Sequence, residues 1–121
     1  MDTRSKILNP EAAPHACTVV TGAFDVLRAE DARELAEVRA SYPDRSLLVV
    51  VLPLAEELLP QRARAELVAA LRMVDYVVIA DHSAQDTLLA CLEPAELVRL
   101  EQAQAERKRQ LMEHAHRKQS S

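Results

Sequence analysis

Residues 47–52 read Leu-Leu-Val-Val-Val-Leu, the longest uninterrupted apolar run in the chain. A strand with one face in solvent alternates apolar and polar residues, whereas a strand covered on both faces is apolar throughout. Two further runs have the same character, at residues 17–21 and 76–80. The three runs therefore predict parallel strands that are buried between layers of helices.

The intervals between these runs carry helical periodicity. In the first interval, apolar residues recur at steps of three and four, at Ala32, Leu35, Val38 and Tyr42. The second interval repeats this pattern after Pro60, at Ala63, Leu67, Ala70, Leu71 and Val74. The order strand, helix, strand, helix, strand predicts a βαβαβ unit with right-handed crossovers, which is half of a Rossmann fold.

The C-terminal third of the chain is rich in helix-forming residues. Ser83 is a candidate N-cap for a short helix ending near Leu92, and Glu93-Pro94 is a candidate start for another. Nothing breaks a helix over residues 95–118, so we expect one long helix there. Its apolar stripe consists of Leu97, Leu100, Leu111 and Met112. Gln104 and Arg107 interrupt the stripe at positions where a coiled coil would be apolar.

The length of 121 residues suits one domain. We expect a flexible leader over residues 1–16, an α/β domain over 17–94, and a C-terminal helix and tail over 95–121. The predicted fold is a three-layer α/β domain with a truncated parallel sheet.

Composition excludes several classes of function. The chain has one glycine, Gly22, so it holds neither a Walker A loop nor a dinucleotide fingerprint. Three aromatic residues and a net charge of -4 argue against nucleic-acid binding. Without a secretory signal or a membrane-spanning apolar run, we expect a cytoplasmic protein with no membrane partner. Cys17 and Cys91 are expected to be buried, reduced thiols.

A family resemblance appears around the glycine. Residues 19–27 read Val-Val-Thr-Gly-Ala-Phe-Asp-Val-Leu, and Glu34-Leu35 follow. Residues 64–79 read Arg-Ala-Glu-Leu-Val-Ala-Ala-Leu-Arg-Met-Val-Asp-Tyr-Val-Val-Ile. The two stretches resemble the cytidylyltransferase-like nucleotidyltransferases, among them the adenylyltransferase domain of bacterial ADP-heptose synthesis and glycerol-3-phosphate cytidylyltransferase. The resemblance covers about residues 17–94.

The resemblance implies a Rossmann-like domain of the HUP type that binds ATP or CTP, with Mg²⁺ accompanying the nucleotide if the protein is active. The nucleotide-binding positions that it implies are Gly22, Phe24, Asp25, Arg28 and Arg64. No catalytic residue and no resident metal ligand is assigned. An arginine on a helix is more often solvated or paired, so Arg64 also has a structural interpretation.

The family's catalytic motif is replaced. Family members carry His-x-Gly-His where this chain has Arg28-Ala29-Glu30-Asp31, so both phosphate-stabilising histidines are absent. A carboxylate about 4 Å from a phosphate charge costs on the order of 4 kcal/mol at an effective dielectric of 20. A helix N-terminus returns only about 0.3–1 kcal/mol. We therefore expect Glu30 and Asp31 to fill the helix start themselves; the alternatives are Mg²⁺ held by Asp25, Glu30 and Asp31, or weak ligand binding through Arg28.

Two further family features are missing. The loop over residues 53–61 has no lysine, and the family's later strands and Ser/Thr motif are replaced by the charged helix. In the family's sheet order the first strand would then have one unpaired edge, which is a liability. We expect the C-terminal helix, from the same chain or a second copy, to cover that edge and to support a homo-oligomer.

The remaining polar candidates favour structural roles. Asp75 is expected to cap or end the helix before the third strand, and His82 lies at its ligand-binding end. His114 and His116 are two positions apart on a helix, which is wrong for a shared metal.

Three functional interpretations follow. The first is a degenerate cytidylyltransferase-like domain that lacks nucleotidyl transfer and acts in ligand binding or self-association. The second is a divergent nucleotidyltransferase that transfers AMP or CMP to a sugar or polyol phosphate, with Arg28 and Arg64 neutralising the phosphates. The third is a regulatory partner of an active relative.

Overall fold

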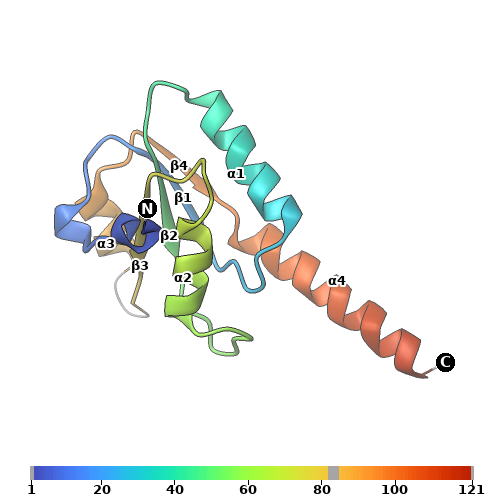
Figure 1. Cartoon of the computed structure of the whole chain (residues 1–121). Helices are drawn as coiled ribbons and strands as arrows, with labels where there is room; N and C mark the ends of the chain where they lie inside the picture. Colours follow the sequence, from blue (N-terminus) through green and yellow to red (C-terminus); the bar gives the residue numbers. More distant parts are fainter. Residues whose placement is uncertain (1, 82–84, 121) are drawn as a thin grey trace.

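The computed structural model describes residues 2–81 and 85–120, the last few by their backbone alone. Four parallel strands form one sheet, in the order β3-β2-β1-β4 (Figure 1). The strands are β1 Thr18–Gly22, β2 Leu47–Val51, β3 Tyr76–Ile79 and β4 Glu96–Arg99. The helices are α1 Ala29–Ser41, α2 Gln61–Ala69, α3 Gln85–Leu92 and α4 Glu101–Ser120. Two short 3-10 helices, η1 Thr3–Lys6 and η2 Pro10–Ala12, precede β1.

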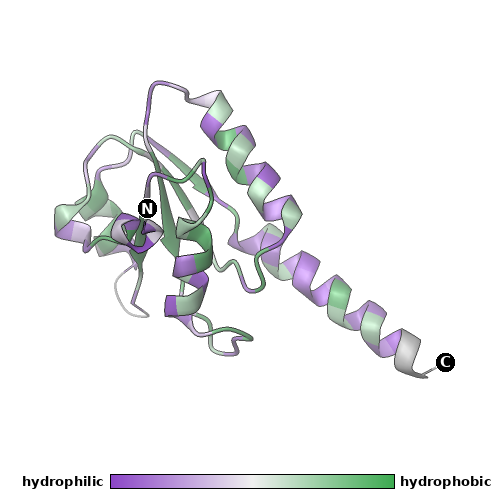
Figure 2. Ribbon diagram, viewed as in Figure 1, coloured by the Kyte–Doolittle hydropathy of each residue, from purple (hydrophilic) through white to green (hydrophobic). Residues whose placement is uncertain are grey.

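The sheet is covered on both faces, which confirms the three-layer α/β fold. Alternate residues of β1 and β2 enter two separate cores. Val20 and Val49 lie in the core that includes Leu35 of α1 and Val68 of α2. Their apolar sequence neighbours Val19, Leu48 and Val50 lie in the second core, with Leu92 of α3. Figure 2 shows the corresponding apolar strands between helices of mixed polarity.

The fourth strand corrects our expectation for the C-terminal segment. Residues 96–99 pair in parallel with β1, from Thr18 opposite Glu96 to Thr21 opposite Arg99, and the long helix begins only at Glu101. The outer edge of β1 is therefore covered by a strand and not by the helix. A strand was missed because Leu97 and Val98 are flanked by charged residues within a segment of strong helix formers.

The first residues of the chain contact the third strand. Leu8 N donates to Val77 O at 2.8 Å, and Lys6 Nζ donates to Leu71 O at 3.1 Å. Of the two free cysteines, Cys17 is buried as expected, and burial raises the pKa of its thiol. Cys91 is exposed on α3, so the expectation of a buried thiol is wrong there. In the part of the chain described, no helix has the length and apolar character needed to cross a membrane.

Candidate functional site

The strand order reverses at β1, whose neighbours β2 and β4 lead away on opposite sides. In open α/β sheets, ligands bind at such a reversal, beyond the carboxyl ends of the strands. In this chain α4 starts at that end and lies across it (Figure 1). Thr21 Oγ1 at the end of β1 donates to Glu101 Oε2 in the first turn of α4, at 2.7 Å. The crevice is therefore bordered by a helix that belongs to the same chain.

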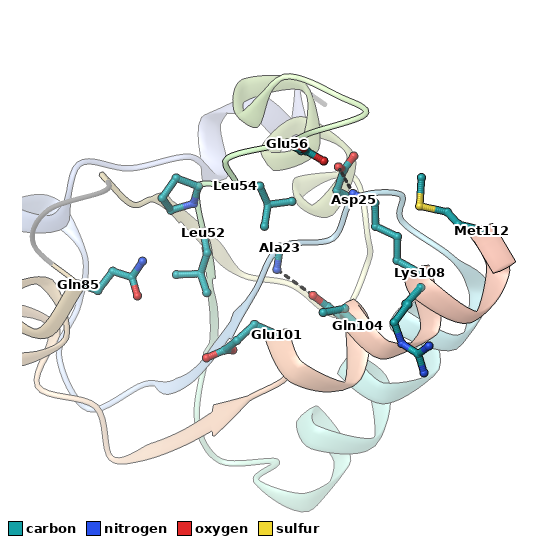
Figure 3. A pocket seen from close by; sticks show the side chains of 13 residues that line it. Ala23, Asp25, Leu52, Leu54, Glu56, Gln85, Glu101, Gln104, Lys108 and Met112 are labelled. Carbon is teal, nitrogen blue, oxygen red and sulfur yellow. Dashed lines mark hydrogen bonds and ion pairs between the residues drawn. The ribbon is translucent and has the colours of Figure 1, made fainter.

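The backbone amides that follow β1 already have a partner. Ala23 N and Phe24 N donate to Gln104 Oε1 of α4, at 2.8 and 3.1 Å. Figure 3 shows the contact from Ala23. Gln104 itself is 8% exposed. Paired amides at this turn are the usual ligands of a phosphate group. In this fold both amides donate to one side-chain carbonyl oxygen, that of Gln104.

The single glycine is explained by the same contact. A Cβ on Gly22 would lie 2.7 Å from Phe24 Cε2 and 2.8 Å from Gln104 Oε1. Both separations are shorter than a Cβ normally makes, so a larger residue at this position would force the Phe24 ring or the Gln104 amide to shift. The close approach to Gly22 is made by the Phe24 ring and the Gln104 amide.

Asp25 is a buried anchor between two segments. Its carboxylate accepts from Leu58 N at 2.7 Å, from Leu59 N at 3.0 Å and from Lys108 Nζ at 3.1 Å. Burial raises the pKa of this carboxyl, but the hydrogen bonds from Leu58, Lys108 and Leu59 outweigh burial and hold the pKa below its ordinary value of 3.8. Asp25 is therefore ionised at neutral pH, with all three partners belonging to the chain.

A carboxylate of α1 itself accepts a backbone hydrogen bond at the start of this helix. Asp31 Oδ2 accepts from Arg28 N at 2.8 Å, in the manner of a capping residue. The other oxygen, Asp31 Oδ1, lies 2.7 Å from Arg107 Nη2 of α4, and the same guanidinium contacts Glu34 at 2.6 Å and Glu30 at 3.6 Å. Burial lowers the pKa of the Arg107 guanidinium, but the contacts with Asp31 and Glu34 raise it by more. The pKa therefore lies above its ordinary value. This geometry agrees with the expectation that the acidic residues fill the helix start.

Arg64 is fully buried and holds backbone carbonyls. Its Nη1 donates to Ala23 O at 2.8 Å and to Leu52 O at 2.9 Å, and its Nε donates to Leu59 O at 3.1 Å. Nη2 pairs with Glu57 Oε2 at 2.7 Å. The guanidinium joins the turns after β1 and β2. Its surface is fully shielded from solvent.

A cavity of about 460 Å³ lies beside these contacts (Figure 3). Leu52, Pro53 and Leu54 form its apolar wall after β2, and Ala105 and Met112 extend that wall along α4. The charged side chains that line it are Asp25, Glu56, Glu101, Lys108 and Arg109. Carboxylates thus outnumber cations among the lining residues, and Lys108 is already paired with Asp25.

The implied nucleotide-binding positions are brought together only in part. Gly22, Phe24 and Asp25 lie at the end of β1, and Arg28, at the start of α1, lines a smaller hollow of about 50 Å³ together with Phe24 and Asp25. The described residues contain no group of three His, Cys, Asp or Glu side chains that could hold a metal ion. His82 and Ser83 lie outside the described residues.

The site residues that sequence reasoning missed all come from α4. Gln104, Arg107 and Lys108 share one helix face, on which Gln104 and Lys108 contact the loop after β1 and Arg107 contacts α1. The available signal was the interruption of the apolar stripe, because a polar residue on a packing face needs a buried partner. Asp75 also has a wider role than a helix cap, since it accepts from Leu47 N at 2.8 Å and pairs with Arg39 of α1.

The sheet order and layers define the class of protein as a Rossmann-like α/β domain. No family model and no curated protein matches the sequence. Among solved structures, the chain is similar to the lipopolysaccharide core biosynthesis protein from Thermoplasma volcanium GSS1, with a TM-score of 0.60 and 19% identity. The match covers 68% of this chain and 71% of that one, and at this identity it supports the fold.

Proposed function

We propose that this chain is a degenerate cytidylyltransferase-like domain that does not transfer nucleotidyl groups and acts by binding. The fold class and the resemblance of residues 19–27 and 64–79 support the family assignment. Replacement of both motif histidines by Arg28 and Asp31 supports the loss of catalysis. Ligand binding in the cavity beside α4 and self-association through α4 are the two activities that remain.

The occupation of the Ala23 and Phe24 amides by Gln104 is the observation that carries this proposal. A phosphate that used these amides would first have to displace a buried side chain from two hydrogen bonds. Each such bond contributes about 0.5–1.5 kcal/mol, and breaking it leaves a buried donor without a partner. The site is therefore closed by the folded chain itself.

The charge of the residues that line the cavity also argues against binding of a nucleotide. A nucleoside triphosphate brings several negative charges to a wall where Asp25, Glu56 and Glu101 outnumber the cations. Arg64, the second cation assigned to the phosphates in the divergent-enzyme interpretation, is fully buried and engaged with carbonyls. The cavity is better suited to a small ligand with an apolar body and little negative charge.

Calorimetric titration with ATP and with CTP, each with and without Mg²⁺, tests the proposal. We expect no saturable heat from either nucleotide, and no pyrophosphate release when glycerol 3-phosphate or a sugar phosphate is added. Micromolar binding together with pyrophosphate release would establish the divergent nucleotidyltransferase in its place.

A matched pair of variants tests whether the Gln104 side chain is the group that excludes phosphate. Gln104→Ala frees the Ala23 and Phe24 amides, whereas Gln110→Ala makes the same change on an exposed turn of the same helix. If Gln104 closes the site, inorganic phosphate or pyrophosphate should bind to the Gln104 variant more tightly than to the Gln110 variant. Equal binding by both variants would argue that Gln104 does not exclude phosphate.

A further inference from the structure

Polar side chains attach α4 to the rest of the domain. Among the described side chains of residues 101–117, Gln104 is the one that is buried, and neither core contains a residue of this range. The contacts with the domain are the hydrogen bonds and ion pairs of Glu101, Gln104, Arg107 and Lys108. Most helices of globular proteins are held by an apolar face that packs into a core. α4 has no such face against the domain.

The helices that cover the sheet are packed differently. Leu35 of α1, Val68 of α2 and Leu92 of α3 are fully buried in the two cores. In α4, residues 109–117 are all exposed, and this part of the helix projects away from the sheet (Figure 1). Burial of apolar surface is the main source of folding stability, so elements with few buried apolar contacts open at a lower cost than the core.

α4 covers or borders the main parts of the candidate site. Gln104 accepts from the amides of Ala23 and Phe24, and Lys108 pairs with the carboxylate of Asp25. Six of the thirteen residues that line the 460 Å³ cavity belong to α4, and Figure 3 shows the helix along one side of this cavity. Movement of α4 would therefore uncover the two amides and remove one wall of the cavity.

We propose that α4 is a lid, which leaves the domain as a unit while the sheet stays folded. This inference rests on the proposed function and deepens its binding part, because access to the site then depends on the position of α4. The hinge is Leu100, the one residue between β4 and α4. Leu100 N donates to Thr21 O at 2.8 Å and its side chain lies in the first core, so β4 stays anchored when the helix moves.

Opening separates ion pairs that exist only in the closed state. Arg107 pairs with Asp31 and Glu34 of α1, and Lys108 pairs with Asp25. In each pair the cation belongs to the lid and the carboxylate to the domain that it covers. Loss of the Arg107 guanidinium therefore destabilises the closed state and leaves the open state, in which these contacts are already broken, unchanged.

Native-state hydrogen exchange of the full chain tests the lid. In wild type, the amides of Ala23, Phe24 and residues 104–108 should share one opening equilibrium. They should exchange at least about tenfold faster than the amides of Val49 and Val50, because β2 lies between two strands and opens only when the domain unfolds. Low concentrations of denaturant should affect the first group less than the second, since opening of the lid exposes less surface than unfolding.

Two variants separate opening of the lid from unfolding of the domain. Arg107→Met destabilises the closed state alone, so it should speed both groups of amides by the same factor, at least about fivefold. Val68→Ala removes core packing that the closed and open states share. It should speed the β2 group by at least about tenfold and leave the Ala23 and Phe24 group unchanged. Ile79→Val is a milder core variant, with the same pattern expected, in case Val68→Ala does not fold.

Arg109→Met serves as the matched control on the same helix. It removes ion pairs with Glu106 and Glu113 that lie within α4 and hold no part of the domain, so both groups of amides should keep their wild-type order of exchange and their rates within about twofold. An Arg109→Met variant that matches Arg107→Met would contradict the role of the Arg107 contacts in closure.

Three outcomes would overturn the inference. In the first, all these amides exchange through one global unfolding event. In the second, Val68→Ala speeds both groups equally. In the third, Ala23 and Phe24 exchange while residues 104–108 stay protected, because movement of the loop alone then explains the result. Titration with ATP separates the two proposals: a protein that neither binds ATP nor opens separately contradicts only the lid, whereas ATP binding and pyrophosphate release with separate opening contradict only the proposed function.

Discussion

Lys108 Nζ lies 3.1 Å from Asp25 Oδ2, and the carboxylate that it neutralises is completely buried. This contact joins the third residue after β1 to the third turn of α4. The same carboxylate receives Leu58 N and Leu59 N, so three segments meet at one side chain. The helix and the two loops are therefore expected to lose their order together when this carboxylate is removed or protonated.

The lowered pKa of Asp25 predicts acid sensitivity. Because the folded-state pKa lies below 3.8, the ionised carboxylate stabilises the fold at neutral pH. That contribution is lost as the pH falls below 3.8 toward the folded-state pKa. Urea unfolding at neutral and at acid pH should show a smaller pH dependence for Asp25→Asn than for wild type. Asp44→Asn, at an exposed position, should keep the wild-type pH dependence.

Gly22→Ala should destabilise the domain by about 1–3 kcal/mol, the usual cost of forcing an extra methyl group into a filled space. The added Cβ meets the Phe24 ring and the Gln104 amide. Thermal and urea unfolding measure the loss. Combining Gly22→Ala with Gln104→Ala relieves one of the two clashes, so the double variant should lose less than the two single losses together. Strict additivity would show that Gln104 does not press on Gly22.

Arg64→Met should cost about 3–5 kcal/mol, because three carbonyls and the Glu57 carboxylate lose their shared donor. Arg64→Lys should recover part of this loss, since an ammonium group can still donate to one or two of the carbonyls. Arg62→Met on the same helix removes only an exposed pair with Glu66 and should change stability by less than about 0.5 kcal/mol. Equal losses in the Arg62 and Arg64 variants would contradict the clamping role.

Gln104→Ala should cost about 1–3 kcal/mol by leaving the Ala23 and Phe24 amides without a partner. Gln104→Glu keeps an acceptor in place and should cost less. Hydrogen exchange at the two amides reads out the contact directly, and protection should fall in the alanine variant while it persists in the glutamate variant. Unchanged protection in Gln104→Ala would mean that these amides are shielded by something other than Gln104.

The helices and strands that sequence predicts well are those whose burial is uniform. Residues 47–52 are apolar throughout because helices cover both faces of β2, and that condition leaves a clear pattern. β4 lies at an edge and alternates between half-buried and exposed residues, so Leu97 and Val98 carry only a weak strand signal. Four residues of this kind cannot outweigh the helix-forming residues around them.

The contacts of the candidate site also differ in how well the sequence predicts them, because some are local in the chain and others are not. The capping of α1 by Asp31 is a contact within one helical turn, and the sequence predicts it from local rules. The contacts of Gln104, Arg107 and Lys108 join residues far apart in the chain. Nothing in their local sequence specifies which loop they reach, so only the fold identifies them as part of the site.

Because β4 pairs with the central strand β1, the sheet is complete only after β4 has been synthesised. β1 is central, yet its partner β4 follows β2 and β3 along the chain. Until the ribosome has added β4, the emerging domain presents an open edge along Thr18–Gly22. Such edges recruit other strands. Truncated or stalled products that end before Glu96 should therefore be prone to aggregation, because the strand that covers this edge is absent from them.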